Sequence, residues 1–227
     1  MRQLIYIPVI HMSADLGSIA KQVDKRGIAG FGEEFWERHK ETISGFWDSI
    51  VKYFTDLEVE HFKIYQDGMV TDGEVAQKIV EEGVKSGSKN FEIIENLVKK
   101  GAVIVHTEDL ALVKKERDRI VRISQAKTIT RKLAAYFQYR LTRDWLLRKR
   151  DNYVAKRIDE TLSHGETGIL FMGAYHNIVP KLSKKILITT VKDPDKVGDY
   201  QRLLLHCKRN KEEFEELARY LVAPVTD

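Results

Sequence analysis

Five short apolar segments recur along the chain and predict buried β-strands. Each is rich in branched or aromatic side chains and is followed by polar residues or glycine, which is typical of a strand that ends at a turn. The predicted strands span residues 4–10, 59–65, 102–105, 168–172 and 185–191. All are far shorter than the ~20 apolar residues that a membrane-spanning helix needs.

The segments between these strands carry apolar residues every three or four positions, which predicts amphipathic helices. A short first helix is expected to end at about residue 24, before the glycine-rich segment 27–32. Residues 35–54 carry a Trp and Phe stripe that is expected to pack in the core, and the proline-free region 110–164 predicts one or two long helices. Because strands that alternate with helices need crossover connections, we predict an α/β fold that is helix-rich, with a mostly parallel or mixed central sheet of about five strands.

The composition fits a soluble globular protein. The chain has 227 residues, of which 43% are hydrophobic, and this predicts a single α/β domain over residues 1–227. Its one cysteine, Cys207, excludes an internal disulfide and any cysteine-based zinc site. No stretch resembles a membrane span or a secretory signal, so we expect a cytoplasmic protein.

Positive charge is concentrated in one part of the chain. Residues 114–157 contain 15 Lys or Arg and four Asp or Glu, a net charge of +11, whereas the rest of the chain carries −7. The simpler interpretation is a long helix whose cationic face is solvated or pairs with acidic neighbours. The alternative is a non-enzymatic module that binds nucleic acid or another anionic ligand through this region.

A titratable residue follows every predicted strand. In chain order these residues are His11, Asp67, His106, Glu108, Asp109, His176 and Asp193. The carboxyl ends of parallel strands share one edge of a sheet, so these side chains are expected to line one pocket there. Asp67 and Asp193 are also ordinary turn residues, which makes the histidines, only seven in the chain, the stronger candidates.

Imidazoles and carboxylates at one sheet edge can hold a divalent metal such as Zn²⁺ or Mn²⁺ with an open coordination position. His11 and His176 are the predicted metal ligands, and His106, Asp67 and Tyr175 are expected to contact the substrate. A metal held in this way activates water, so the predicted reaction is hydrolysis of a small polar or anionic substrate. Without a metal, the same residues can act as general acid and base.

Several other chemistries are disfavoured by motifs that the sequence lacks. It contains no Walker loop, no Gly-x-Gly-x-x-Gly after a strand and no Gly-x-Ser-x-Gly elbow. Neither a nucleotide cradle nor a serine hydrolase is therefore expected.

Two motifs in the second half of the chain resemble a known family. Residues 150–155 (RDNYVA) open an Arg-bearing helical segment, and the hydrophobic strand that follows ends in Gly-x-x-His at 173–176. This order resembles the second repeat of the TraB and Tiki group, some of whose members are similar to metal-dependent proteases. The resemblance implies two structural repeats, about 1–107 and 108–227. In the first, Pro8 stands where the family's motif has glycine.

The resemblance also implies a set of site residues. These are His176, His11 and Arg150, with Glu33 and Glu34 as the glutamate pair of the first repeat. Arg150 has a physical argument of its own, because a guanidinium beside imidazoles and carboxylates can clamp a substrate carboxylate or phosphate with two hydrogen bonds.

Overall fold

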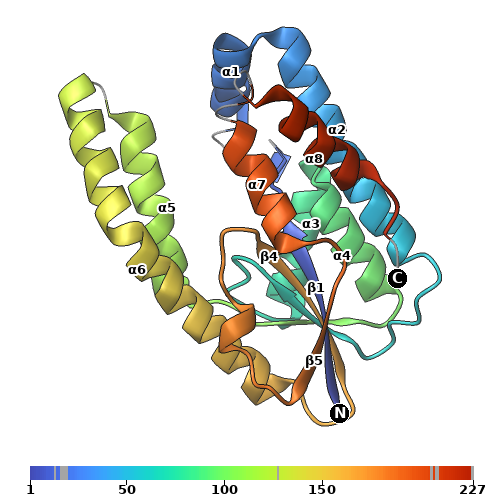
Figure 1. The fold of residues 1–227 in the computed structure, drawn as a ribbon. Helices are drawn as coiled ribbons and strands as arrows, with labels where there is room; N and C mark the ends of the chain where they lie inside the picture. Colours follow the sequence, from blue (N-terminus) through green and yellow to red (C-terminus); the bar gives the residue numbers. More distant parts are fainter. Residues whose placement is uncertain (13, 16–19, 127, 205–206, 208–209, 226–227) are drawn as a thin grey trace.

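A five-stranded parallel sheet forms the centre of the structure (Figure 1). The computed structural model describes residues 1–227 except 13, 16–19, 127, 205–206, 208–209 and 226–227. The strands are β1 (Arg2–Val9), β2 (Lys63–Gln66), β3 (Val103–Val105), β4 (Thr167–Gly173) and β5 (Ile186–Thr190). They lie in the order β3-β2-β4-β1-β5, and every neighbouring pair is parallel. The predicted α/β class and its five strands are confirmed.

Strand β4 lies in the middle of the sheet. Ile169 of β4 is opposite Ile5 of β1 on one side and Ile64 of β2 on the other. Residues 168–173 are all buried, which explains why this segment is continuously apolar instead of alternating. The carboxyl ends of β1, β2 and β4 are therefore direct neighbours.

The second strand begins four residues later than the sequence pattern indicates. Residues 60–61 form a turn in which His61 has a φ of 66° and donates its backbone N–H to the carbonyl oxygen of Gly101 (3.0 Å). Val59 is buried in the core although it lies outside the strand. Its burial, and not strand pairing, accounts for the apolar position at the start of the predicted segment.

Helices cover both faces of the sheet. They are α1 (Ala20–Phe31), α2 (Glu33–Tyr53), α3 (Gly73–Lys85), α4 (Lys89–Lys99), α5 (Leu110–Gln125), α6 (Ile129–Thr161), α7 (Pro194–Leu204) and α8 (Lys211–Val222), with a 3₁₀ helix η2 (Val179–Lys181). Ile5 and Ile7 of β1 pack in the larger core with α2, α3, α4, α7 and α8. Leu4 and Tyr6 point to the other face and pack in a smaller core with α6.

The first helix ends later than predicted. α1 continues past Gly27 to Phe31, and the break falls at Gly32, which has a φ of 91°. Position 27 of this helix requires glycine, because a Cβ there would lie only 2.3 Å from the ring of Trp36. The predicted aromatic core of α2 is confirmed, since Trp36, Phe46 and Trp47 are all buried.

Region 110–161 contains two long helices, one of the two predicted arrangements. The second half of α6 packs on the sheet, whereas α5 and the first half of α6 form a hairpin that projects from the rest of the molecule (Figure 1). Among the described residues, no helix is both long enough and apolar enough to cross a membrane.

Candidate functional site

Loops at the carboxyl edge of the sheet bring a cluster of acidic residues together with one arginine and one histidine. Asp67 follows β2 directly, while Glu108 and His176 lie three residues after β3 and β4. Helices α5 and α6 supply the remaining members. The cluster, named here the edge cluster, consists of Asp67, Glu108, Glu116, Arg150, Asp151 and His176.

Arg150 is the centre of the edge cluster. Its Nη2 lies 2.6 Å from Oδ1 of Asp67, and its Nε donates to Oε2 of Glu108 at 3.1 Å. Further ion pairs join its Nη2 to the second oxygen of Glu108 and its Nη1 to Glu116. Burial by itself lowers the pKa of Arg150, but these carboxylates outweigh burial and raise it.

These contacts change the role expected of Arg150. The residue is only 6% exposed, and three carboxylates already occupy its donors. A guanidinium in this position holds the carboxylates of its own chain in place. This arrangement does not favour the expected role of Arg150 as a clamp for a substrate anion.

His176 is oriented by a carboxylate. Its Nδ1 lies 2.6 Å from Oδ1 of Asp151, whose other oxygen accepts the backbone N–H of Asn177 (3.3 Å). Since an ionised carboxylate only accepts hydrogen bonds, Nδ1 carries the proton and Nε2 is left to face Oδ2 of Asp67 at 3.7 Å. Burial lowers the pKa of His176, but the charge of Asp67 and the hydrogen bond to Asp151 outweigh it, so the pKa is raised.

The two strand-end carboxyl groups have opposite pKa shifts. Burial raises the pKa of Asp67, but the charges of His176 and Arg150 outweigh it and hold this pKa well below its usual value. For Glu108, which is fully buried, the same desolvation prevails and the pKa is raised despite the hydrogen bonds from Arg150. Asp67 therefore stays ionised, while Glu108 takes up a proton more readily.

Three members of the edge cluster form a set that suits a metal ion. Asp67, Glu108 and His176 each offer a ligand atom, and these atoms lie within 4.8 Å of one another. Ligands of one Zn²⁺ lie at about 2.0–2.2 Å and so span up to about 4.4 Å, a slightly tighter arrangement. The carboxylate on the far nitrogen of His176 is also the orienting contact that metal-bound histidines usually have. Donor type and orientation therefore both fit a divalent ion.

His11 lies beside the edge cluster and not within it. Its Nδ1 is 3.8 Å from Oδ2 of Asp15, and its side chain is 44% exposed. Partial desolvation lowers the pKa of His11, but Asp15 and the charge of Asp67 outweigh it and raise the pKa. His11 is thus electrostatically coupled to the site, although the three-residue ligand set does not include it.

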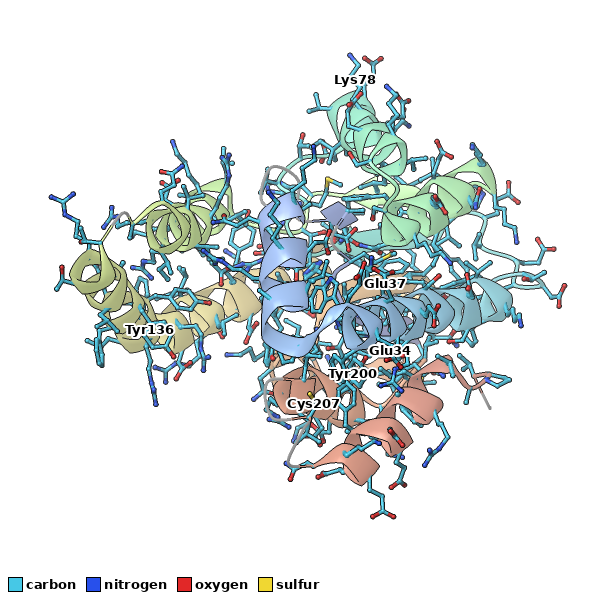
Figure 2. All side chains as sticks on the ribbon, turned by 90° about the horizontal axis from the view of Figure 1, so that it is seen from above. Glu34, Glu37, Lys78, Tyr136, Tyr200 and Cys207 are labelled. Atoms are coloured by element: carbon cyan, nitrogen blue, oxygen red, sulfur yellow. The ribbon has the colours of Figure 1, made fainter. Side chains whose placement is uncertain are left out.

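The remaining predicted residues have other surroundings. Nε2 of His106 contacts the carbonyl oxygen of Glu108 (2.7 Å), so His106 holds the loop that carries that ligand. Tyr175 is 56% exposed. Glu33 and Glu34 are exposed in the first turn of α2, where Figure 2 labels Glu34, and no described hydrogen bond or ion pair joins either to the edge cluster.

Sequence reasoning missed part of the cluster. Glu108 was recognised as a strand-end residue but not selected, and Glu116 and Asp151 had no strand-end signal because both lie inside helices. Asp151 is adjacent to Arg150 in sequence, which was the one available indication. Asp193, by contrast, has the turn role that its sequence also allowed, since it accepts the backbone N–H of Asp195 at the start of α7 (2.9 Å).

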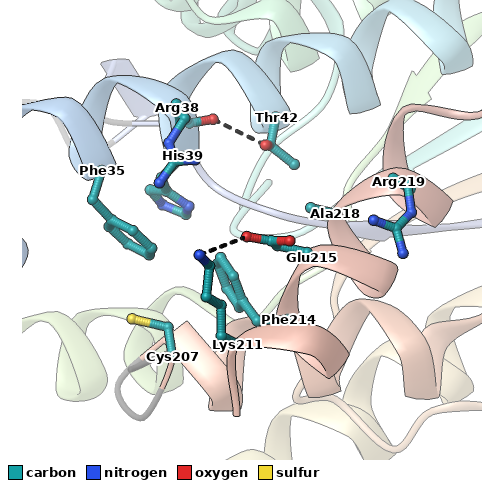
Figure 3. A pocket seen from close by; sticks show the side chains of 10 residues that line it. All are labelled: Phe35, Arg38, His39, Thr42, Cys207, Lys211, Phe214, Glu215, Ala218 and Arg219. Carbon is teal, nitrogen blue, oxygen red and sulfur yellow. Dashed lines mark hydrogen bonds and ion pairs between the residues drawn. The ribbon is translucent and has the colours of Figure 1, made fainter. Parts of the chain in front are cut away.

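Two cavities lie near α2. One, of about 410 Å³, lies between α2 and α8 and has no edge-cluster residue in its wall (Figure 3). The other, of about 270 Å³, is lined mostly by apolar side chains and includes His11. His39 lines both cavities. Among the described residues, neither cavity has an edge-cluster residue in its wall, and His11 is the one predicted site residue that lines the smaller cavity.

His39 provides a test of burial in this region. Its Nδ1 and the hydroxyl of Tyr200 are 2.8 Å apart, and burial lowers the pKa of His39 to about 4. Between its usual value of 6.5 and about 4, the unfolded chain binds a proton that the folded chain does not. Stability should therefore fall by up to about 3 kcal/mol as the pH drops through this window, as measured by urea unfolding.

The matched variant is His39→Gln, which keeps a hydrogen-bonding side chain but does not titrate. The difference in unfolding free energy between wild type and His39→Gln isolates the histidine from other groups that titrate in the same range. Parallel pH profiles for the two proteins would show that His39 is not the source of the loss.

Comparison of the chain with protein-family models, curated proteins and solved structures finds no significant match. The geometry and charge of the edge cluster therefore carry the information about function.

Proposed function

We propose that this protein is a hydrolase that acts at the edge cluster on a small polar substrate, with Zn²⁺ or Mn²⁺ bound by Asp67, Glu108 and His176. The observation that supports this most directly is the convergence of two carboxylates and one oriented imidazole within 4.8 Å at the carboxyl edge of a parallel sheet. Ligands and substrates commonly bind at this edge in open α/β sheets.

The charge balance of the edge cluster supports a bound cation. The cluster contains four carboxyl groups but only one guanidinium, and the raised pKa values of Glu108 and His176 favour protonation, which offsets part of the negative charge. A divalent ion would offset it more fully. An anionic substrate also needs that ion, because the carboxylates alone would repel it. A neutral polar substrate does not.

Each residue has a separate task in this proposal. Asp151 keeps the proton of His176 on Nδ1, so that Nε2 is free to bind a cation or to accept a proton. Arg150 fixes the carboxylates of Asp67 and Glu108, and the backbone N–H of Gly173 donates a further bond to Asp67 (3.1 Å). When bound, the ion would supply an acidified water and polarise the bond to be cleaved.

Metal titration tests the proposal. We expect the chelator-treated chain to bind one equivalent of Mn²⁺ or Zn²⁺ by calorimetry, and Asp67→Asn to weaken this binding about tenfold or more because a charged ligand is lost. The matched control is Asp72→Asn, since Asp72 is exposed at the start of α3 and its side chain makes no cap hydrogen bond. Equal affinities of wild type and Asp67→Asn would exclude this ligand set.

Turnover is tested separately on a panel of chromogenic esters, amides and phosphoesters with the metal-loaded chain. We expect hydrolysis of at least one class, lost in His176→Ala and retained in Asp72→Asn. Stoichiometric metal binding without any turnover on the panel would leave a metal-binding protein and contradict the hydrolase.

A further inference from the structure

The hairpin of α5 and the first half of α6, residues 110–145, is here named the helical arm. It stands apart from the helices that cover the sheet, as Figure 1 shows and as Figure 2 shows around the labelled Tyr136. No side chain that the structure describes within the arm is buried, and the first buried residue of α6 is Leu146. Among its described side chains, the arm therefore has no buried core that would explain its apolar residues.

The apolar side chains of α6 form a stripe along the arm. Its members and their exposed fractions are Leu133 (51%), Tyr136 (47%), Phe137 (60%), Leu141 (83%) and Trp145 (43%). Four of them recur at intervals of four residues, so they follow one side of the helix. The opposite side of α6 carries Ala135, Tyr139 and Thr142, which are half-buried. Leu133, Phe137 and Leu141 therefore point to solvent, whereas Trp145, at the base of the stripe, lies beside Lys115 of α5.

Positive charge accompanies the stripe. Residues 110–145 contain ten Lys or Arg and three Asp or Glu, a net charge of +7. At the base of the arm, the ammonium groups of Lys115 and Lys149 lie 5.8 Å and 5.9 Å from the ring centre of Trp145. Two arms of this charge would repel each other, so the arm of a second copy is a poor partner. An anionic surface is a good one.

We infer that the helical arm docks on the surface of an anionic phospholipid membrane. Its apolar stripe would enter the boundary between headgroups and acyl chains, while Lys and Arg contact lipid phosphates, which is how basic amphipathic helices bind membranes. Nucleic acid explains the charge and the aromatic members of the stripe, but not its aliphatic members. Aliphatic side chains such as Leu133 and Leu141 neither stack on bases nor bind phosphate.

Docking in this way also orients the edge cluster. α6 is one continuous helix from residue 129 to 161, so the arm and Arg150 belong to one rigid element. Trp145 and Arg150 are separated by about 7.5 Å of helix rise. The docked arm thus holds the site close to the lipid surface. The inference itself does not depend on the hydrolase proposal, because its test needs no turnover.

The test is co-sedimentation of the full-length protein with vesicles. We expect binding to vesicles of phosphatidylcholine and phosphatidylglycerol at about 2:1, and about tenfold weaker binding to phosphatidylcholine alone or at high salt. Phe137→Ser with Leu141→Ser should weaken binding to the anionic vesicles about tenfold or more, with no change in net charge. The matched control is Val75→Ser with Ile79→Ser, an exposed apolar pair at the same spacing on α3.

A second readout follows the arm directly. Of the three tryptophans, Trp36 and Trp47 are buried and Trp145 is exposed, so a blue shift of fluorescence on adding anionic vesicles reports insertion of the arm. Equal vesicle binding by the arm variant and the α3 variant would overturn the inference. So would an absence of vesicle binding at low salt, whether the arm then binds an RNA or DNA oligonucleotide or joins two copies of the chain.

Discussion

Replacing Arg150 with methionine is expected to destabilise the folded protein by about 3–5 kcal/mol, because it leaves carboxylates in a buried site without their cation. Asp67, Glu108 and Glu116 all pair with this guanidinium, and Glu108 has no exposed surface. Methionine has a similar length and fills much of the space. The loss of stability therefore comes mainly from the missing positive charge and not from a cavity. Urea unfolding at neutral pH measures it.

The matched control is Arg148→Met, two residues earlier on the same helix and exposed. It should change stability by less than about 0.5 kcal/mol. The destabilisation by Arg150→Lys should lie between those of Arg150→Met and Arg148→Met, since an ammonium keeps the charge but loses the bidentate contact with Glu108. If Arg150→Met and Arg148→Met proved equally mild, the ion pairs of the edge cluster would contribute no net stability.

The pH dependence of the Arg150→Met effect provides a further check. In the wild type the pKa of Asp67 is lowered, so its stabilising contribution is present above its usual value of 3.8 and is lost on acidification below it. Without Arg150, the buried carboxyl groups should have raised pKa values. Their protonation as the pH falls should remove the unpaired buried charge and so reduce the loss of stability in the variant. The difference in unfolding free energy between wild type and Arg150→Met should therefore become smaller as the pH falls from 7 to about 4.

The strands were predictable because buried parallel strands are short, continuously apolar segments bounded by turns. Their order was not predictable. Nothing in residues 167–173 indicates that β4 lies between β1 and β2, because the order depends on how the crossover connections pack and leaves no local pattern in the strand. The error at α1 has a similar origin. A glycine often marks the end of a helix, but Gly27 lies inside α1. It is needed there because Trp36 packs closely against the helix.

The site was predictable to the extent that strand ends determine it. Asp67 and His176 could be identified because parallel strands bring their carboxyl ends together. Glu116 and Asp151 reach the edge cluster only through the packing of α5 and α6, which leaves no local pattern. Arg150 was expected at the site, but its partners are carboxylates of the chain itself.

The basic region 114–157 also divides in a way that counting charges could not show. Arg150 lies inside the protein and balances buried acids, whereas most of the other cations lie on the exposed helical arm. One sequence feature thus serves two physical purposes. Buried charge organises the edge cluster, and exposed charge is available to a partner.

Trp47→Ala is expected to cost about 4–5 kcal/mol of folding free energy, the largest loss predicted for a single side chain. Trp47 is fully buried in the larger core, and its Nε1 donates to the carbonyl oxygen of Ile10 (3.2 Å). Truncation leaves a cavity and a buried carbonyl without its donor, directly before His11. Trp47→Phe, which refills most of the cavity but lacks the donor, should cost about 1–3 kcal/mol.

Trp145→Ala is the control with the same chemical change in a different environment. Trp145 is exposed on the helical arm and its described ring contacts are with Lys115 and Lys149, so its loss should cost less than about 1 kcal/mol in urea unfolding. A similar cost for both truncations would mean that the arm is packed against something in solution, which contradicts its exposure. A small cost for Trp47→Ala would mean that α2 is not the centre of the core. The two tryptophans therefore separate the part of the sequence that stabilises the fold from the part that faces outward.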